Sequence, residues 1–158
     1  MRISFDLDET LILSNPVYPC EPLLGFPFPF VYTERLRKGT IDLMKQLRAC
    51  GHEVCVYTTS ERPVPHIRKL FRRYGIHLAC VVNEAVHMEK VQDGRLEIMP
   101  SKYPPKFGID LHFDDEVTVQ QNGRQFGFRV CVVDPVDEEW VSKVLAEVAH
   151  VEWVLGNR

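Results

Sequence analysis

The sequence lacks a long apolar run, a strong charge imbalance and a cysteine framework. None of its hydrophobic stretches approaches the roughly 20 apolar residues of a membrane-spanning helix, so we expect no membrane segment. The net charge of −3 argues against non-specific nucleic-acid binding as the main task. Five cysteines, an odd number without framework spacing, fit a reducing compartment, so we expect a cytoplasmic protein. A cleaved signal peptide is not expected either, because cleavage would remove the acidic residues after the first strand.

The spacing of Cys50, His52 and Cys55 briefly suggests a metal site. Cys55, however, alternates with Val54 and Val56 in an apolar run that is typical of a strand. We therefore interpret Cys55 as a buried structural thiol rather than a metal ligand.

The chain of 158 residues is long enough for one domain, 1–158, which would bury about two-thirds of its unfolded surface. Apolar β-branched runs predict strands, and apolar residues at helical spacing predict helices. Strands that alternate with helices imply right-handed crossovers and an α/β fold with a parallel sheet covered on both faces. The predicted strands are 2–6, 53–57, 79–82, 109–113 and 128–133, and the predicted helices are 34–50, 63–74 and 136–154.

Two segments depart from this alternation. Residues 14–33 hold five prolines, which forbid a regular helix, and many aromatic residues, which disordered linkers lack. We expect an ordered flap that either borders a site or only packs against the domain. Residues 83–100 predict a small insertion, in which Asp93-Gly94 between Val91 and Leu96 suggests a β-hairpin.

Polar side chains follow three of the predicted strands, at the point where each strand ends. Asp6 and Asp8 follow the first strand, Thr58 the second, and Asp114 and Asp115 the fourth. One strand ending in a polar turn, with an acid as a helix cap, would be unremarkable alone. Three strand ends that deliver acid, hydroxyl and acid to the same sheet edge are hard to explain by packing. We therefore expect a functional site at this edge.

These residues resemble the motifs of the haloacid dehalogenase-like superfamily of phosphatases, in its small form without a large cap domain. The family's first motif, Asp-x-Asp-x-Thr after a strand, matches Asp6 to Thr10, and its second, a hydroxyl that ends an apolar strand, matches Thr58. The fourth, an apolar strand ending in two acids, matches 110–115. The third is a lysine before the fourth, for which both Lys102 and Lys106 qualify. The resemblance spans residues 2 to about 133 and implies a Rossmann-like three-layer sandwich with the first strand central.

The resemblance implies a Mg²⁺-dependent phosphatase. Asp6 would be the nucleophile that forms an aspartyl-phosphate, and Asp8 the general acid and then base. Thr58 would hydrogen-bond a phosphoryl oxygen, and Lys102, favoured because a proline pair could hold its loop across the strand ends, would neutralise charge. Asp6, the backbone carbonyl of Asp8, and Asp114 would hold Mg²⁺, with Asp115 behind Asp114. Further substrate contacts are expected from Thr10, Thr59 and Lys106.

An alternative from another class is a catalytically weak module on the same fold that binds a phosphorylated ligand or a protein. The acid at Asp8 favours the enzyme, because a binding module has no need of it. The substrate, a phosphorylated compound of unknown class, is not readable from the sequence, and nucleic-acid ends and phosphotransfer stay open. The missing cap favours either a substrate larger than a small sugar phosphate or a site completed by oligomerisation.

Other polar and aromatic residues have more ordinary interpretations. Asn83 and His87 either border the site or are surface residues. A cationic group near the second predicted helix is expected to be a solvated helix face rather than an anion site, and two tryptophans near the last helix are expected to pack. The cationic group is Arg62, Arg68, Lys69, Arg72 and Arg73, and the tryptophans are Trp140 and Trp153.

Overall fold

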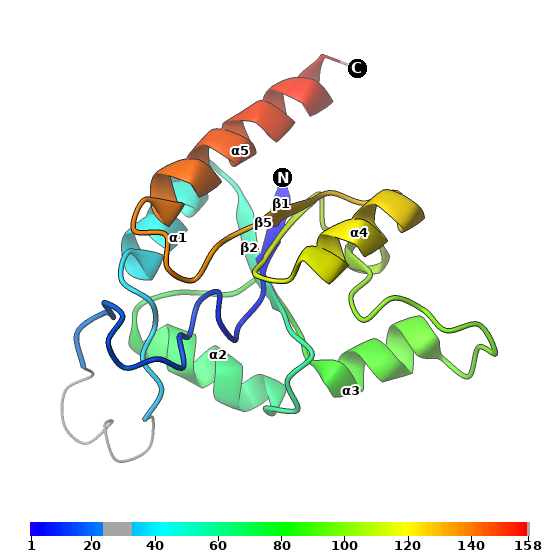
Figure 1. The fold of residues 1–158 in the computed structure, drawn as a ribbon, viewed down its shortest axis with the longest axis horizontal. Helices are drawn as coiled ribbons and strands as arrows, with labels where there is room; N and C mark the ends of the chain where they lie inside the picture. Colours follow the sequence, from blue (N-terminus) through cyan, green and yellow to red (C-terminus); the bar gives the residue numbers. More distant parts are fainter. Residues whose placement is uncertain (24–32, 158) are drawn as a thin grey trace.

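The computed structural model describes residues 1–23 and 33–157. These residues form a five-stranded sheet in the order β3-β2-β1-β4-β5, in which every pair of neighbours is parallel, and five α-helices (Figure 1). The predicted α/β class with a central parallel sheet is therefore confirmed. In the described part of the chain, no helix is both long and apolar enough to cross a membrane.

All five predicted strands are present, with ends that differ by a few residues. The strands are β1 (Arg2–Phe5), β2 (Glu53–Tyr57), β3 (Cys80–Val82), β4 (Leu111–Asp114) and β5 (Val130–Val132). The α-helices are α1 (Thr40–Ala49), α2 (Val64–Arg73), α3 (Glu84–His87), α4 (Val117–Phe126) and α5 (Trp140–Gly156). A π-helical turn, Met88–Gln92, continues α3, and a 3₁₀ turn, Pro104–Phe107, precedes β4.

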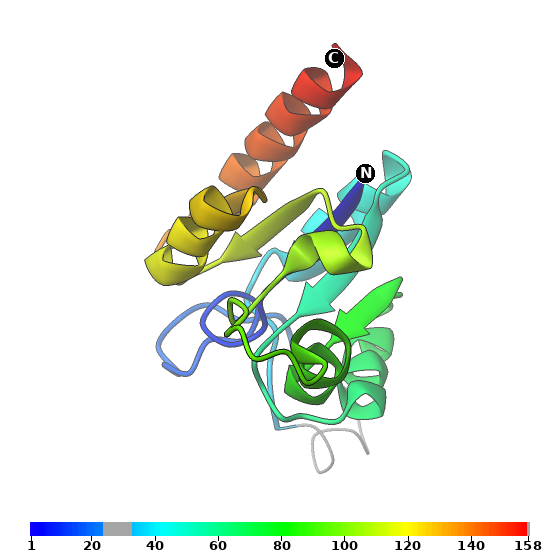
Figure 2. The same cartoon turned by 90° about the vertical axis from the view of Figure 1, so that its right-hand side faces the viewer.

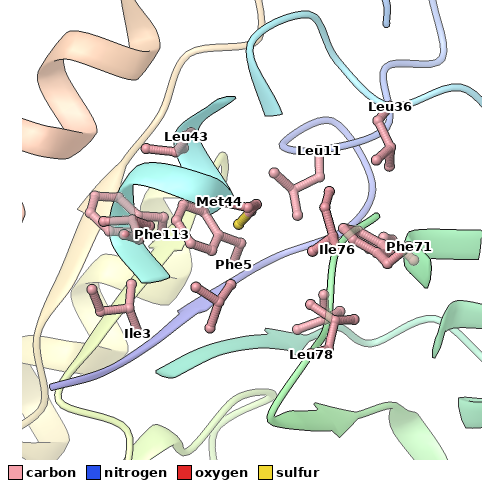
Figure 3. Close-up of a cluster of buried hydrophobic side chains, with 14 of the residues drawn as sticks. Ile3, Phe5, Leu11, Leu36, Leu43, Met44, Phe71, Ile76, Leu78 and Phe113 are labelled. Atoms are coloured by element: carbon pink, nitrogen blue, oxygen red, sulfur yellow. The ribbon is translucent and has the colours of Figure 1, made fainter. Parts of the chain in front are cut away.

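The centre of the sheet is β1, which pairs with β2 on one side and β4 on the other. Phe5 stands opposite Val56 and Phe113, and the Phe5 and Phe113 rings stack with centroids 5.0 Å apart (Figure 3). Both rings are fully buried, which stabilises each by roughly 1.5–3 kcal/mol relative to exposure. This packing fixes the last residues of the central strands and hence the positions of the polar residues that follow.

The strand order reverses at β1, because the chain runs outward to β3 and then returns to β4 on the other side. In open parallel sheets, ligands bind beyond the carboxyl ends of the strands at such a reversal. Figures 1 and 2 show the segment after β1 at the opposite end of the molecule from both termini. The predicted site residues therefore meet where this fold places a ligand.

The helix predicted over 34–50 begins only at Thr40, so its first six residues were predicted wrongly. The N–H of Glu21 donates to Leu36 O and that of Lys38 to Pro19 O, so residues 36–38 pair with the described end of the flap. Gly39 then takes a φ of 91°, which a helix excludes. The rest of the predicted flap, residues 24–32, lies outside the described residues.

The hairpin predicted within residues 83–100 is also wrong, since α3 and the π-helical turn occupy its first half. The Asn83 side chain accepts the N–H of Val86 at 3.1 Å and so caps α3. Leu96 and Ile98, whose alternation suggested a strand, are 103% and 91% exposed. They have no sheet face to pack against, so their pattern did not reflect burial.

Helix α4 was not predicted. It begins with β-branched residues and contains Gly123, which are poor helix formers. A Cβ on Gly123 would lie 2.7 Å from the carbonyl oxygen of Phe128, so close packing against the chain before β5 requires glycine there. A tertiary contact, rather than helix propensity, selects this residue.

Of two interpretations of single residue types, the one for cysteine is confirmed and the one for tryptophan is partly wrong. Cys55 is buried as expected, and Trp140 packs at 3% exposed. Trp153 does not pack as predicted, because it faces outward from α5 and is 66% exposed.

Candidate active site

Three strands deliver the predicted residues to one place. The N–H of Asp6 donates to Phe113 O at 2.8 Å, and the N–H of Thr58 donates to Val82 O at 2.9 Å. These bonds continue the sheet by one residue beyond β1 and β2, so both side chains are held by backbone pairing rather than by flexible loops. Asp6, Thr58 and Asp114, the last residue of β4, are all buried.

Lys102 lies between two of these acids. Its Nζ donates to Asp6 Oδ1 and to Asp114 Oδ2, each at 2.6 Å, and the residue is only 3% exposed. The loop is fixed beside it, because the N–H of Tyr103 donates to the Tyr57 hydroxyl at 2.8 Å. The other candidate lysine, Lys106, is exposed in the 3₁₀ turn.

Asp114 is held from behind by a buried histidine. Its Oδ2 lies 2.8 Å from His112 Nε2, and the other ring nitrogen, Nδ1, lies 2.8 Å from the Ser4 hydroxyl. Burial lowers the pKa of His112, which favours the neutral ring. The ring then donates from Nε2 to the carboxylate and accepts the Ser4 hydroxyl at Nδ1. This chain of contacts joins β1 to β4 beneath the site.

The two acids bound to Lys102 differ in their protonation. Burial, together with the negative charge of Asp114, raises the pKa of Asp6 to about 7 against the opposing positive charge of Lys102. For Asp114 burial acts in the same direction, but the His112 hydrogen bond and the charge of Lys102 outweigh it and lower its pKa to about 2. One ammonium shared by two buried carboxylates thus fully stabilises only one of them. A further cation would favour the ionised form of Asp6.

Asp6, Asp114 and Asp115 can each offer an oxygen to one metal ion. The three ligand atoms lie within 4.8 Å of one another, and they form the one such group of His, Cys, Asp and Glu side chains in the described residues. An all-oxygen set suits a hard cation such as Mg²⁺. Thr10, predicted to contact substrate, is fully buried with its hydroxyl 3.5 Å from Asp115 Oδ1. Its position supports the acid rather than reaching a ligand.

Asp8 lies at the open side of the site and is bound by an arginine that was expected to face solvent. Arg62 Nη1 and Nη2 donate to the two carboxylate oxygens of Asp8, each at 2.8 Å, and its Nε donates to Glu34 at 2.6 Å. Arg62 precedes α2, and its side chain is 28% exposed. The solvated-helix interpretation is therefore wrong for Arg62, although Lys69 and Arg72 are exposed as expected.

A cleft of about 340 Å³ opens from Asp8 along the loop that follows β1. Its walls combine charged groups with apolar side chains, so it offers both a polar end at Asp8 and an apolar side. The residues that line it include Asp8, Glu9, Leu13, Glu34, Arg35 and Arg62.

Three further residues considered from the sequence differ in burial. Thr59 is exposed, next to the buried Thr58, and its predicted substrate contact stays a prediction. Asn83 and His87 are not surface residues, since they are 5% and 7% exposed. The Nδ2 of Asn83 donates to the carbonyl of Arg62 at 3.0 Å, and His87 Nδ1 lies 2.6 Å from the Tyr57 hydroxyl. Both therefore support loops of the site from beneath.

Sequence reasoning missed four contributors to the site: Ser4, His112, Arg62 and Glu34. His112 had a weak signal, because a histidine inside an apolar strand is unusual. Arg62 follows Thr58 by four residues, so its proximity to the site could be inferred, though not its pairing with Asp8. Glu34 has no local signal, because it reaches the site only through the path of the chain before α1.

In comparisons with known proteins, no protein-family model matches the chain, and no curated protein matches it either. Membership of the haloacid dehalogenase-like superfamily therefore stays a prediction from the sequence motifs.

Proposed function

We propose that this protein is a Mg²⁺-dependent phosphatase of the haloacid dehalogenase-like type, which hydrolyses a phosphate monoester through an aspartyl-phosphate. The observation that carries the proposal is Lys102, whose Nζ donates at 2.6 Å to both Asp6 and Asp114, beside a third acid, Asp115. A buried cation between strand-end carboxylates, with a hydroxyl from the neighbouring strand, supplies the charge and donors that phosphoryl transfer requires.

The oxygen atoms of the site fit a Mg²⁺ ion. We assign Asp6, Asp115 and the backbone carbonyl of Asp8 as its protein ligands. Both carboxylate oxygens of Asp114 already accept hydrogen bonds, from Lys102 and His112 at Oδ2 and from the Glu116 N–H at Oδ1. Asp115 has fewer partners, so we assign Asp115 rather than Asp114 as the direct ligand. Position along the strand had led us to expect Asp114. When bound, the ion supplies positive charge against the phosphoryl oxygens and keeps Asp6 ionised.

In the first half of the reaction, a carboxylate oxygen of Asp6 attacks phosphorus while the bond from phosphorus to the leaving oxygen breaks. Asp8 donates a proton to that oxygen, so the product leaves as an alcohol. Thr58 Oγ already accepts the N–H of Ser60 at 3.1 Å, so its hydroxyl hydrogen is available to a phosphoryl oxygen. Lys102 offsets negative charge on the phosphoryl group and on the nucleophile.

In the second half, water loses a proton to Asp8 and attacks phosphorus. The bond between phosphorus and the Asp6 oxygen breaks, which restores the carboxylate and releases inorganic phosphate. The same acid thus serves both halves, and this requires its carboxyl group to face the cleft from which both the leaving group and water approach.

One observation favours the alternative of a weak binding module. Arg62 donates to both carboxylate oxygens of Asp8 and so competes with a leaving oxygen for that carboxylate. A module that only binds a phosphorylated ligand needs no mobile acid there. Turnover separates the two functions, because binding alone releases no phosphate.

The experiment measures phosphate release from a chromogenic phosphate ester with and without Mg²⁺. We expect Mg²⁺-dependent turnover by the wild type and none by Asp6→Asn, which lacks the attacking oxygen. Asp42→Asn, a matched substitution on the exposed face of α1, should retain full activity. Undiminished turnover by purified Asp6→Asn would refute the covalent mechanism, and no turnover by any form would favour the binding module.

A further inference from the structure

The contact between Arg62 and Asp8 has the geometry of a substrate-binding contact. A guanidinium edge that donates two parallel hydrogen bonds matches a carboxylate or a phosphate equally well. Here the edge formed by Nη1 and Nη2 is occupied by the Asp8 carboxylate, with each distance 2.8 Å. The third nitrogen, Nε, is bound separately by Glu34 at 2.6 Å. Nη1 also donates to the Ser60 hydroxyl at 2.7 Å, so Glu34 and Ser60 retain the side chain while the edge that faces Asp8 changes partner.

Opening of this pair favours the reaction proposed above. While Arg62 donates to both oxygens of Asp8, its guanidinium competes with the leaving oxygen and with water for the same carboxylate. The backbone around Arg62 is fixed, since its carbonyl accepts Asn83 Nδ2 at 3.0 Å and its N–H donates to the Ser60 hydroxyl at 3.2 Å. The change of partner thus falls on the guanidinium rather than on the loop.

We propose that Arg62 is a specificity residue that exchanges Asp8 for a second anionic group of the substrate. The substrate class is a small phosphate monoester that bears a carboxylate or second phosphate close to the ester oxygen. This class departs from the larger substrate or oligomeric site that the missing cap favoured in the sequence. This inference rests on the proposed phosphatase function and names the substrate class of the same site. Binding of the second anion to Arg62 frees Asp8, so the correct substrate itself activates the acid.

The position of the cleft supports this class of substrate. Asp8 serves the leaving oxygen, so the leaving group lies on its side of the site, where the cleft of about 340 Å³ begins. That volume is at the lower end for small-molecule sites, which run from about 300 to 1,000 Å³. Arg62 donates directly to Asp8, so an anion that takes over its edge lies within a few bonds of the ester oxygen.

The charge of the cleft indicates exchange rather than simple attraction. Three carboxylates, from Asp8, Glu9 and Glu34, face two guanidinium groups, from Arg35 and Arg62, so the lining carries one excess negative charge. A substrate anion is therefore not drawn in by a general positive field. It is accepted only where it replaces the Asp8 carboxylate on Arg62, which makes recognition local and dependent on one residue.

The test compares two substrates that differ in a single group: 2-phosphoglycerate, which carries a carboxylate beside the ester, and glycerol 2-phosphate, which carries a hydroxymethyl group there. Values of kcat/KM are measured for the wild type, Arg62→Gln and Arg62→Lys. The control is Arg72→Gln, which removes the same charge from the exposed face of α2 and should alter neither substrate's rate.

We expect the wild type to prefer 2-phosphoglycerate by about tenfold or more, the worth of a charge-assisted contact. Arg62→Gln should lower kcat/KM for 2-phosphoglycerate by about tenfold and raise kcat for glycerol 2-phosphate, because Asp8 is no longer held. Arg62→Lys keeps the charge without the two-bond edge, so its rates on both substrates should lie between those of the wild type and Arg62→Gln. Opposite changes on the two substrates are the signature of exchange, because a purely structural role would lower both rates.

Equal losses on both substrates, or an unchanged preference in Arg62→Gln with native circular dichroism, would overturn the proposal. If the wild type hydrolyses neither compound nor a chromogenic ester, the phosphatase function has failed instead. Calorimetric binding of the two compounds then tests the Arg62 contact by itself. Tighter binding of 2-phosphoglycerate that Arg62→Gln abolishes supports it, and equal binding of both compounds rejects it.

Discussion

Among single residues, Lys102 has the strongest electrostatic role. It is 3% exposed and forms ion pairs with two buried carboxylates, Asp6 and Asp114. We predict that Lys102→Met abolishes turnover and lowers the free energy of unfolding by about 3–5 kcal/mol, the usual cost of removing one partner of a buried ion pair. Urea denaturation and phosphate release measure the two effects.

The matched control is Lys106→Met, four residues away and exposed. It should change stability by less than about 0.5 kcal/mol, as surface substitutions usually do, and leave turnover unchanged. The opposite pattern, with activity lost only in Lys106→Met, would show that Lys106 is the family's lysine.

The sequence identified the residues whose positions follow from a strand end. Asp6, Thr58 and Asp114 were predictable because parallel strands end at one sheet edge. Arg62 was misjudged because side-chain direction in a loop is set by contacts, here with Asp8 and Glu34, which the local sequence does not encode.

At the scale of elements, β2, α3 and the loop of Lys102 are joined through one tyrosine. The Tyr57 hydroxyl accepts the Tyr103 N–H at 2.8 Å and lies 2.6 Å from His87 Nδ1, to which it donates. Burial lowers the pKa of His87, so the folded protein favours the neutral ring. The unfolded chain protonates this ring near pH 6.5. Stability from neutral His87 is therefore present above about pH 6.5 and is lost as the pH falls below it.

We predict that the His87→Gln variant loses less stability than the wild type as the pH falls. At pH 7.5 the variant should be less stable by about 1 kcal/mol, the net worth of one hydrogen bond, yet between about pH 6.5 and 5 its free energy of unfolding should fall less steeply. Chemical denaturation across this pH range provides the comparison. Parallel pH profiles for wild type and variant would show that His87 does not titrate as proposed.

Elements were predicted where burial and periodicity agree, as in β2 and α2. They were mispredicted where a tertiary contact overrode the local pattern. Residues 36–38 hydrogen-bond to residues 19–21 instead of beginning the helix, and α4 contains Gly123 because the chain before β5 approaches closely. Neither contact has a signal within the segment itself.

For the whole molecule, the metal site should couple ligand binding to stability. Asp6 and Asp115 directly follow β1 and β4, so an ion held by both favours the folded sheet. We predict that Mg²⁺ at about 100 times its Kd adds about 2.7 kcal/mol, which for a chain of this size raises the Tm by roughly 5–10 °C. Chelation should reverse the shift.

Asp115→Asn should reduce that Mg²⁺-induced shift strongly, whereas the exposed control Asp42→Asn should retain it. The comparison of Asp115→Asn with Asp114→Asn decides which acid binds the ion directly. A full shift in Asp115→Asn would return the direct contact to Asp114, as the sequence first suggested.

The most direct test of the account is the chemical identity of the intermediate. The wild type is mixed with Mg²⁺ and a phosphate ester, quenched in acid within the first turnover and digested, and the peptide that contains Asp6 and Asp8 is analysed by fragmentation mass spectrometry. We predict a phosphoryl group on Asp6 that is absent from Asp6→Asn and without Mg²⁺. A phosphoryl group on Asp8, or rapid turnover with no phosphorylated residue at any quench time, would contradict the covalent mechanism at Asp6.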